Sequence, residues 1–97
     1  MYASVVTLQM RPESLGTGAA AWSAIAKDHL KQQKGYKAGY FLTDQATGQA
    51  LVVAFWETDT DAVEYETKGQ YPDLIAAFSN LLTAKPTRVV YEVSAQV

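Results

Sequence analysis

His29 is the side chain of this sequence most easily assigned a role in proton transfer. It is the only histidine in the chain, and a histidine can take up or release a proton near neutral pH. It lies at the edge of an apolar helical stripe, and no Asp or Glu at helical spacing orients it. The alternative interpretation is an exposed helix residue or an interface contact. His29 is therefore the weaker of the candidate site residues.

Aromatic side chains are the second feature with chemical potential. The chain of 97 residues holds two Trp, six Tyr and three Phe. Such rings can line a cavity for a flat apolar ligand, with Tyr hydroxyls and Arg88 as polar anchors. They can equally fill the core and the contact between two subunits. The rings considered for such a role are Trp22, Tyr36, Tyr40, Phe41, Phe55, Trp56, Tyr65, Tyr71, Phe78 and Tyr91.

The sequence argues against cysteine-based, metal and nucleotide-binding sites. The absence of cysteine excludes disulfides, thiolate metal sites and a cysteine nucleophile, and it fits a reducing compartment. The acidic residues between 59 and 66 fit a helix N-terminus and its solvated face better than a metal site. Gly16-Thr17-Gly18 lacks the rest of a nucleotide-binding motif. We therefore expect no metal and no cofactor.

Charge and hydropathy exclude two classes of partner. The net charge is −2 and no basic run exists, which argues against nucleic-acid binding. No basic amphipathic face suggests a membrane surface, and no apolar stretch approaches the roughly 20 residues of a membrane span. No signal peptide is visible. We expect one domain over residues 1–97 and a cytoplasmic location.

Hydrophobic periodicity predicts the element order β-α-β-β-α-α-β. We expect strands over Tyr2–Met10, Tyr36–Thr43, Leu51–Trp56 and Thr87–Ala95. We expect helices over 58–68 and 71–84, and a first helix that ends at 34 and begins near Ser14 or Thr17, because Gly16 and Gly18 weaken any helix there. This is the order of a ferredoxin-like α+β fold, in which a four-stranded antiparallel sheet has its helices on one face.

Local signals mark the ends of these elements. Gly35 is predicted to end the first helix, and Gly69 is predicted to break the second. Thr58 and Asp61 have the spacing of a capping box. The polar segment 44–48 ends in glycine, as a hairpin loop does.

The third predicted strand is apolar on both faces. Alternate residues of Leu51–Trp56 point to opposite sides, and every one of them is apolar. The helices can cover one face, and nothing else in the chain is left to cover the other. We therefore expect a homodimer that pairs the two open sheet faces.

One stretch carries a family resemblance. Gly35-Tyr36 opens the second strand, Trp56-Glu57-Thr58 closes the third, and a helix with Asp61-Ala62-Val63 follows before Tyr71. In these marks the chain resembles the antibiotic biosynthesis monooxygenase-like family of the dimeric α+β barrel superfamily. By element order the resemblance covers nearly the whole chain. The marks are structural, and none is catalytic by itself.

The resemblance implies a homodimer with a pocket between each sheet and its helices. Characterised relatives include cofactor-free monooxygenases that oxidise phenolic or quinol-like aromatics. In that chemistry the electron-rich substrate reduces oxygen, while the protein supplies a dry pocket, a proton acceptor and polar anchors. On this resemblance we place Trp56, Tyr65, Tyr71 and Arg88 near the pocket.

The haem-degrading branch of the superfamily fits less well. The place of its iron-ligating histidine falls near Ile75, and the place of its first-strand asparagine falls near Val6 or Thr7. The expected function is therefore cofactor-independent oxidation of a small aromatic phenol or quinol. The alternative is a non-catalytic dimeric protein of the same fold that binds a small ligand or serves as a scaffold.

Overall fold

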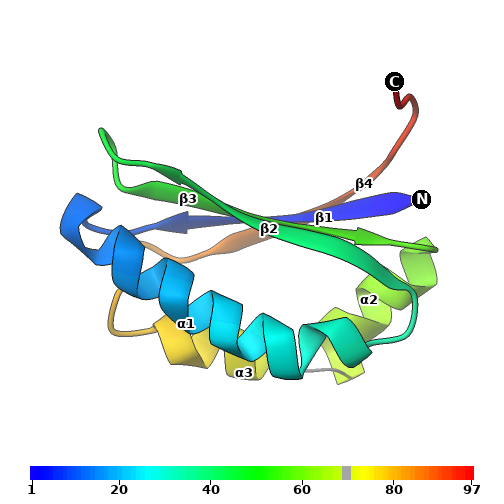
Figure 1. Ribbon diagram of the computed structural model, residues 1–97, viewed down its shortest axis with the longest axis horizontal. Coiled ribbons are helices and arrows are strands. Elements are labelled where there is room, and N and C mark those ends of the chain that lie inside the picture. Colours follow the sequence, from blue (N-terminus) through cyan, green and yellow to red (C-terminus); the bar gives the residue numbers. More distant parts are fainter. Residues whose placement is uncertain (69–70) are drawn as a thin grey trace.

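Two strands rich in apolar and β-branched residues form the centre of the sheet. In the computed structural model, which describes residues 1–68 and 71–97, β1 (Tyr2–Gln9) pairs antiparallel with β3 (Gln49–Trp56). β2 (Tyr36–Asp44) pairs with β3, and β4 (Thr87–Glu92) pairs with β1. The resulting antiparallel sheet has the order β2-β3-β1-β4 (Figure 1).

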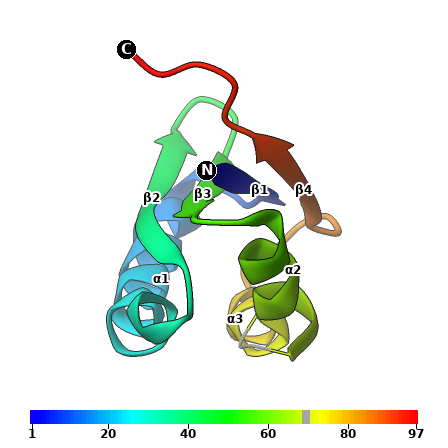
Figure 2. The same cartoon turned by 90° about the vertical axis from the view of Figure 1, so that its right-hand side faces the viewer.

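The helices lie on one face of this sheet (Figure 2). They are α1 (Leu15–Asp28), α2 (Asp59–Lys68) and α3 (Tyr71–Phe78), with short 3-10 turns η1 (Pro12–Ser14) and η2 (Leu30–Gln32) on either side of α1. The predicted ferredoxin-like α+β arrangement is confirmed. No helix in the described ranges is long and apolar enough to cross a membrane.

The core fills the space between the sheet and the helices. Even-numbered residues of β1 and β3 point into it, because successive strand residues alternate between the two faces. The largest side chains that are fully buried there are Trp56, Phe78, Leu8, Met10 and Leu15.

On the opposite face of the sheet, apolar side chains are exposed, and no helix of the described residues covers them (Figure 2). Its central strand contributes Leu51, Val53 and Phe55, all partly exposed. The residues after Glu92 extend away on this side (Figure 1). The outer strands add four side chains that are about half exposed, namely Tyr40, Leu42, Val89 and Tyr91.

Two predicted helix ends are wrong. α1 stops at Asp28 instead of Lys34, because His29 leaves helical geometry at φ −121° and the chain continues as η2. Gly35 does adopt a positive φ of 78°, but it leads into β2 instead of capping α1. α3 ends at Phe78, and the segment after it turns toward the sheet, where Leu82 bridges Met10.

Other boundaries fall close to their predicted places. β4 ends at Glu92 instead of Ala95, because the N–H of Val93 bonds to Met1 O and β1 then offers no further partner. The first half of the predicted capping box forms, since Asp61 N–H donates to Thr58 Oγ1 at 3.1 Å. Gly16 and Gly18 lie inside α1. The predicted break at Gly69 falls outside the described residues.

Candidate functional site

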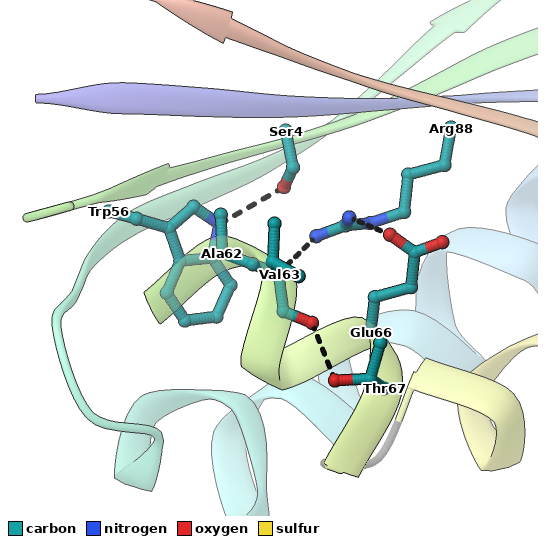
Figure 3. Close-up of polar contacts among 7 residues, drawn as sticks. All are labelled: Ser4, Trp56, Ala62, Val63, Glu66, Thr67 and Arg88. Atoms are coloured by element: carbon teal, nitrogen blue, oxygen red, sulfur yellow. Dashed lines mark hydrogen bonds and ion pairs between the residues drawn. The ribbon is translucent and has the colours of Figure 1, made fainter. Parts of the chain in front are cut away.

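Trp56 is the centre of a buried aromatic cluster at the point where β3 leads into α2. Its side chain has no exposed surface. Its Nε1–H donates to Ser4 Oγ on the neighbouring strand β1 at 3.0 Å (Figure 3). The one polar group of this indole is therefore satisfied by the protein itself.

Two tyrosines flank the Trp56 ring. The ring centres of Tyr36 and Tyr65 lie 5.8 and 5.2 Å from it. Tyr65 also meets Tyr71 in an edge-on arrangement at 6.3 Å, with the two planes at 68°. These separations are typical of favourable aromatic pairs. The four rings form a continuous row from the start of β2 to the start of α3.

Arg88 extends from β4 to the end of this row. Its side chain is only 4% exposed, and Nη1 pairs with Glu66 Oε2 at 2.6 Å. Nη2 donates to the carbonyl oxygen of Ala62 at 2.9 Å (Figure 3). The guanidinium carbon lies 5.2 Å from the centre of the Tyr71 ring, a cation–π contact. Arg88 thus links β4 to both α2 and α3.

The electrostatics of the cluster keep its phenols protonated. Burial raises the pKa of Tyr65 to about 12, although the positive charge of Arg88 acts in the opposite direction. Burial likewise raises the pKa of Tyr71, with Arg88 again opposing and Glu66 adding to the increase. At neutral pH both hydroxyls can therefore donate hydrogen bonds, and neither is suited to act as a phenolate base.

The structure brings together all four residues placed near a pocket by sequence, Trp56, Tyr65, Tyr71 and Arg88. Their role in binding a ligand stays a prediction. Tyr36 belongs to the same cluster; sequence reasoning named it among the aromatic side chains but did not place it near the pocket. The signal that could have found it is strand register, because Tyr36 is the partner of Trp56 across β2 and β3.

His29 lies apart from these contacts. It is exposed at the end of α1, where its backbone N–H bonds to Ile25 O. None of the contacts that build the cluster involves it. Within the described ranges no group of three or more His, Asp or Glu side chains is placed to hold a metal ion.

Two surface hollows lie beside the sheet, and the second is bordered by Tyr36 of the cluster. The first, of about 510 Å³, is on the open sheet face and is lined by Met1, Lys37, Ala38, Tyr40, Phe55, Val93, Ala95 and Gln96. The second, of about 410 Å³, follows the edge strand β2 and is called here the β2 hollow. It is lined by Lys31, Tyr36, Lys37, Ala38, Gly39 and Tyr40.

Solved structures share this arrangement of sheet and helices. A monooxygenase of Streptomyces coelicolor, solved with nanaomycin D, has a TM-score of 0.84 at 16% identity over 99% of this chain and 89% of its own. A candidate antibiotic biosynthesis monooxygenase of Deinococcus radiodurans has a TM-score of 0.80 at 18% identity over 100% and 96%. The chain has the fold of the antibiotic biosynthesis monooxygenases.

The same fold also occurs in a protein of unknown function from Nitrosomonas europaea. Its TM-score is 0.79 at 18% identity, over 99% of this chain and 91% of its own. No protein-family model and no curated protein matches the sequence. The fold expected from the resemblance is therefore confirmed, and activity has to be argued from the site.

Proposed function

We propose that the protein is a cofactor-independent monooxygenase that acts on a small aromatic phenol or quinol. The observation that carries the proposal is the cluster of Trp56, Tyr65, Tyr71 and Arg88 between the sheet and the helices. It occurs in a fold shared with a monooxygenase solved with nanaomycin D. A cytoplasmic location belongs to the proposal, because a chain without cysteine fits a reducing compartment.

The proposed reaction needs no metal or flavin, because an electron-rich phenolate can itself transfer an electron to O₂. For a phenol the net change is a ring C–H converted to a carbonyl, while the hydroxyl becomes a second carbonyl. One oxygen atom of O₂ enters the ring, and the other leaves as water with two hydrogens of the substrate. The phenol loses four electrons and O₂ gains four, so the reaction balances.

The residues of the cluster limit how the substrate loses its proton. Tyr65 and Tyr71 are protonated at neutral pH, and the carboxylate of Glu66 is held by Arg88. The protein then serves mainly to exclude water and orient the ring. Phenols that ionise readily in water should accordingly be the better substrates.

An oxygen electrode provides the direct test. With 1-naphthol as the probe we expect one O₂ consumed for each 1,4-naphthoquinone formed, at the same rate in the presence of EDTA. Tyr71→Phe should lower the rate about tenfold by removing one hydrogen bond. Tyr91→Phe is the matched control, because Tyr91 lies on the opposite face of the sheet and the substitution keeps its apolar ring, so its rate should be unchanged.

A second function is favoured by one specific observation. Trp56 and Tyr65 are 0% and 6% exposed and pack against each other, as residues of a filled core do. A scaffold protein whose interior is filled by its own side chains would have this feature, whereas a non-catalytic ligand-binding protein would need a pocket. Failure of a panel of phenols to stimulate oxygen uptake, with ligand binding intact, would favour the binding function over the enzyme.

We also propose that the functional unit is a homodimer joined through the open sheet face. Exposed apolar side chains gather there, including Tyr40, Leu42, Val89 and Tyr91, and the helices of the same chain lie on the other face (Figure 2). A second copy presents an identical apolar face, and a two-fold axis lets both faces be covered at once. An obligate interface of this kind buries on the order of 2,000 Å² or more.

A further inference from the structure

Small and large side chains alternate across the open face of the sheet at the level of Phe55. On this row, called here the Phe55 row, Ala38 of β2 pairs with Phe55 of β3. Ala3 of β1 pairs with Phe55 on one side and with Tyr91 of β4 on the other. Tyr91 is 56% exposed, whereas Ala3 is 9% exposed. The order across the sheet is therefore small, large, small, large, and the two rings project beyond the two alanines.

The hollow of about 510 Å³ on the open sheet face lies at the β2 end of this row. Its wall includes Ala38, Phe55 and Tyr40, and the last two rings meet edge-on with their centres 6.3 Å apart. Val93 and Ala95 of the C-terminal segment also line it, because this segment runs from the end of β4 toward the β2 side (Figure 2). The small side chain of Ala38 leaves room there for an aromatic ring.

Tyr91 of the same chain cannot fill this hollow. β2 and β4 are the two outer strands of the sheet, so about 14 Å, or three strand spacings, separate them. The projecting Tyr91 ring and the hollow beside Ala38 have complementary shapes that a single chain cannot bring together. A second copy has the same two features and can bring both pairs together.

The direction of the two-fold axis decides whether these features meet. Packed sheets often keep their strands aligned to within about 30°, so an axis that pairs two open faces runs either parallel or perpendicular to the strands. A perpendicular axis places β4 over β4 and leaves each hollow out of reach of Tyr91. A parallel axis between β1 and β3 places β4 of each copy over β2 of the other and keeps the Phe55 rows at one level.

We propose that the two-fold axis of the dimer runs parallel to the strands, so that Tyr91 of each copy enters the hollow beside Ala38 of the other. The same rotation sets Phe55 of each copy opposite Ala3 of the other, so a large side chain meets a small one at all four positions of the row. Stable interfaces have this close packing at their centre. The inference rests on the proposed homodimer and is independent of the proposed oxidation. It makes the hollow part of the interface and not a ligand site.

Charge agrees with this arrangement. Lys37 precedes Ala38 and lines the hollow, while Glu92 follows Tyr91 and is exposed. The parallel axis brings these opposite charges to the same end of the interface. Lys37 already pairs with Glu57 of its own chain and is 47% exposed, so Glu92 of the second copy would join this pair at the rim. Opposite charges at a rim orient the two copies more than they add affinity.

Cross-linking of two single-cysteine variants tests the direction of the axis. The chain has no cysteine of its own, so Ala38→Cys and Tyr91→Cys each carry one thiol. We expect a short bismaleimide to join the two variants when they are co-expressed, and to join neither variant to itself. Each mixed dimer keeps one unaltered contact between Tyr91 and Ala38. Ser23→Cys, which is exposed on α1, is the control and should not be joined to Tyr91→Cys.

An exchange of side-chain size completes the test. Ala38→Phe fills the hollow and should weaken dimerisation about tenfold or more in sedimentation, and Tyr91→Ala in the same chain should restore it. Ala20→Phe, on the exposed surface of α1, should have no effect. A dimer without a cross-link between the 38 and 91 variants would overturn the proposed axis and leave the dimer standing. A wild type that sediments as a monomer would instead refute the dimer itself.

Discussion

At the scale of single residues, the hydrogen bond between the side chains of Ser4 and Trp56 is a polar contact buried in the core. Both side chains are buried, and the bond joins β1 to the end of β3. Ser4→Ala removes the acceptor and leaves a buried N–H without a partner. We expect a loss of about 1–3 kcal/mol in the free energy of unfolding, measured by urea denaturation followed by circular dichroism.

The control for this substitution is Ser23→Ala. Ser23 is exposed on α1, so its replacement by a better helix former should leave stability the same or slightly higher. Equal stabilities of Ser4→Ala and the wild type would mean that water replaces the Ser4 hydroxyl. The indole would then not be sealed from solvent.

Because of Tyr65, the free energy of unfolding should decrease at alkaline pH. Its pKa is about 12 in the folded protein and about 10 in an unfolded chain. Between these values the unfolded chain loses the phenol proton while the folded protein keeps it, so stability falls as the pH rises from 10 to 12. Relative to Tyr65→Phe, the wild type should lose about 2 kcal/mol over this range.

Urea midpoints at several pH values measure this loss. Ser23→Ala is the control, because Ser23 is exposed on α1 and its replacement should leave the alkaline slope as it is in the wild type. A slope for Tyr65→Phe that matches the wild type would show that the Tyr65 ring is solvated.

At the scale of elements, two glycines have opposite structural roles. Gly48 closes the β2–β3 hairpin at φ +80°, and a Cβ there would collide with the carbonyl oxygen of Met10. Gly48→Ala should cost about 2–3 kcal/mol through backbone strain and the shift of Met10. Gly16 lies in the first turn of α1 with nothing within 4 Å of its would-be Cβ, so Gly16→Ala should stabilise by about 0.5–1 kcal/mol.

Thermal melting of the two variants tests whether stability changes in the expected direction in each. The expected result is a lower Tm for Gly48→Ala and a higher Tm for Gly16→Ala. A raised Tm in Gly48→Ala would contradict the hairpin geometry described here. A lowered Tm in Gly16→Ala would mean that the first turn of α1 has contacts beyond those of the single chain.

The same elements show how far the sequence could predict the structure. Periodicity identified every strand, because each has apolar residues on both faces or an alternating pattern. It overran α1 and α3 because the apolar residues Leu30, Leu81 and Leu82 continue the helical spacing, although tertiary contacts place them in turns. Local spacing does not reveal such contacts.

The sequence predicted the part of the candidate site that depends on the order of the elements. Trp56 ends β3, Tyr71 begins α3 and Tyr65 lies on the helix between them, so the element order already brings them near one another. The pairing of Tyr36 with Trp56 depends on strand register, and the contact of Trp22 with Gly39 depends on how α1 packs against the sheet. Neither is encoded in a local pattern.

At the scale of the whole molecule, the uncovered sheet face is the dominant feature. Val53 lies at its centre, partly exposed, between Val5 on β1 and Tyr40 on β2. In a lone chain this position faces water, and a carboxylate there would be solvated. In the proposed dimer it lies in the interface and is shielded from water. The effect of Val53→Asp therefore distinguishes a monomer from a dimer.

We expect the wild type to sediment at twice the mass of its 10.6 kDa chain and Val53→Asp to sediment as a monomer or to unfold. The reason is that burying unpaired charges costs several kcal/mol. Ser23→Asp, which places the same charge on the exposed surface of α1, should leave the dimer intact. A well-folded wild-type monomer at micromolar concentration would refute the dimer. The open face, with its apolar side chains and the hollow bordered by Tyr40 and Phe55, would then be available to a different partner.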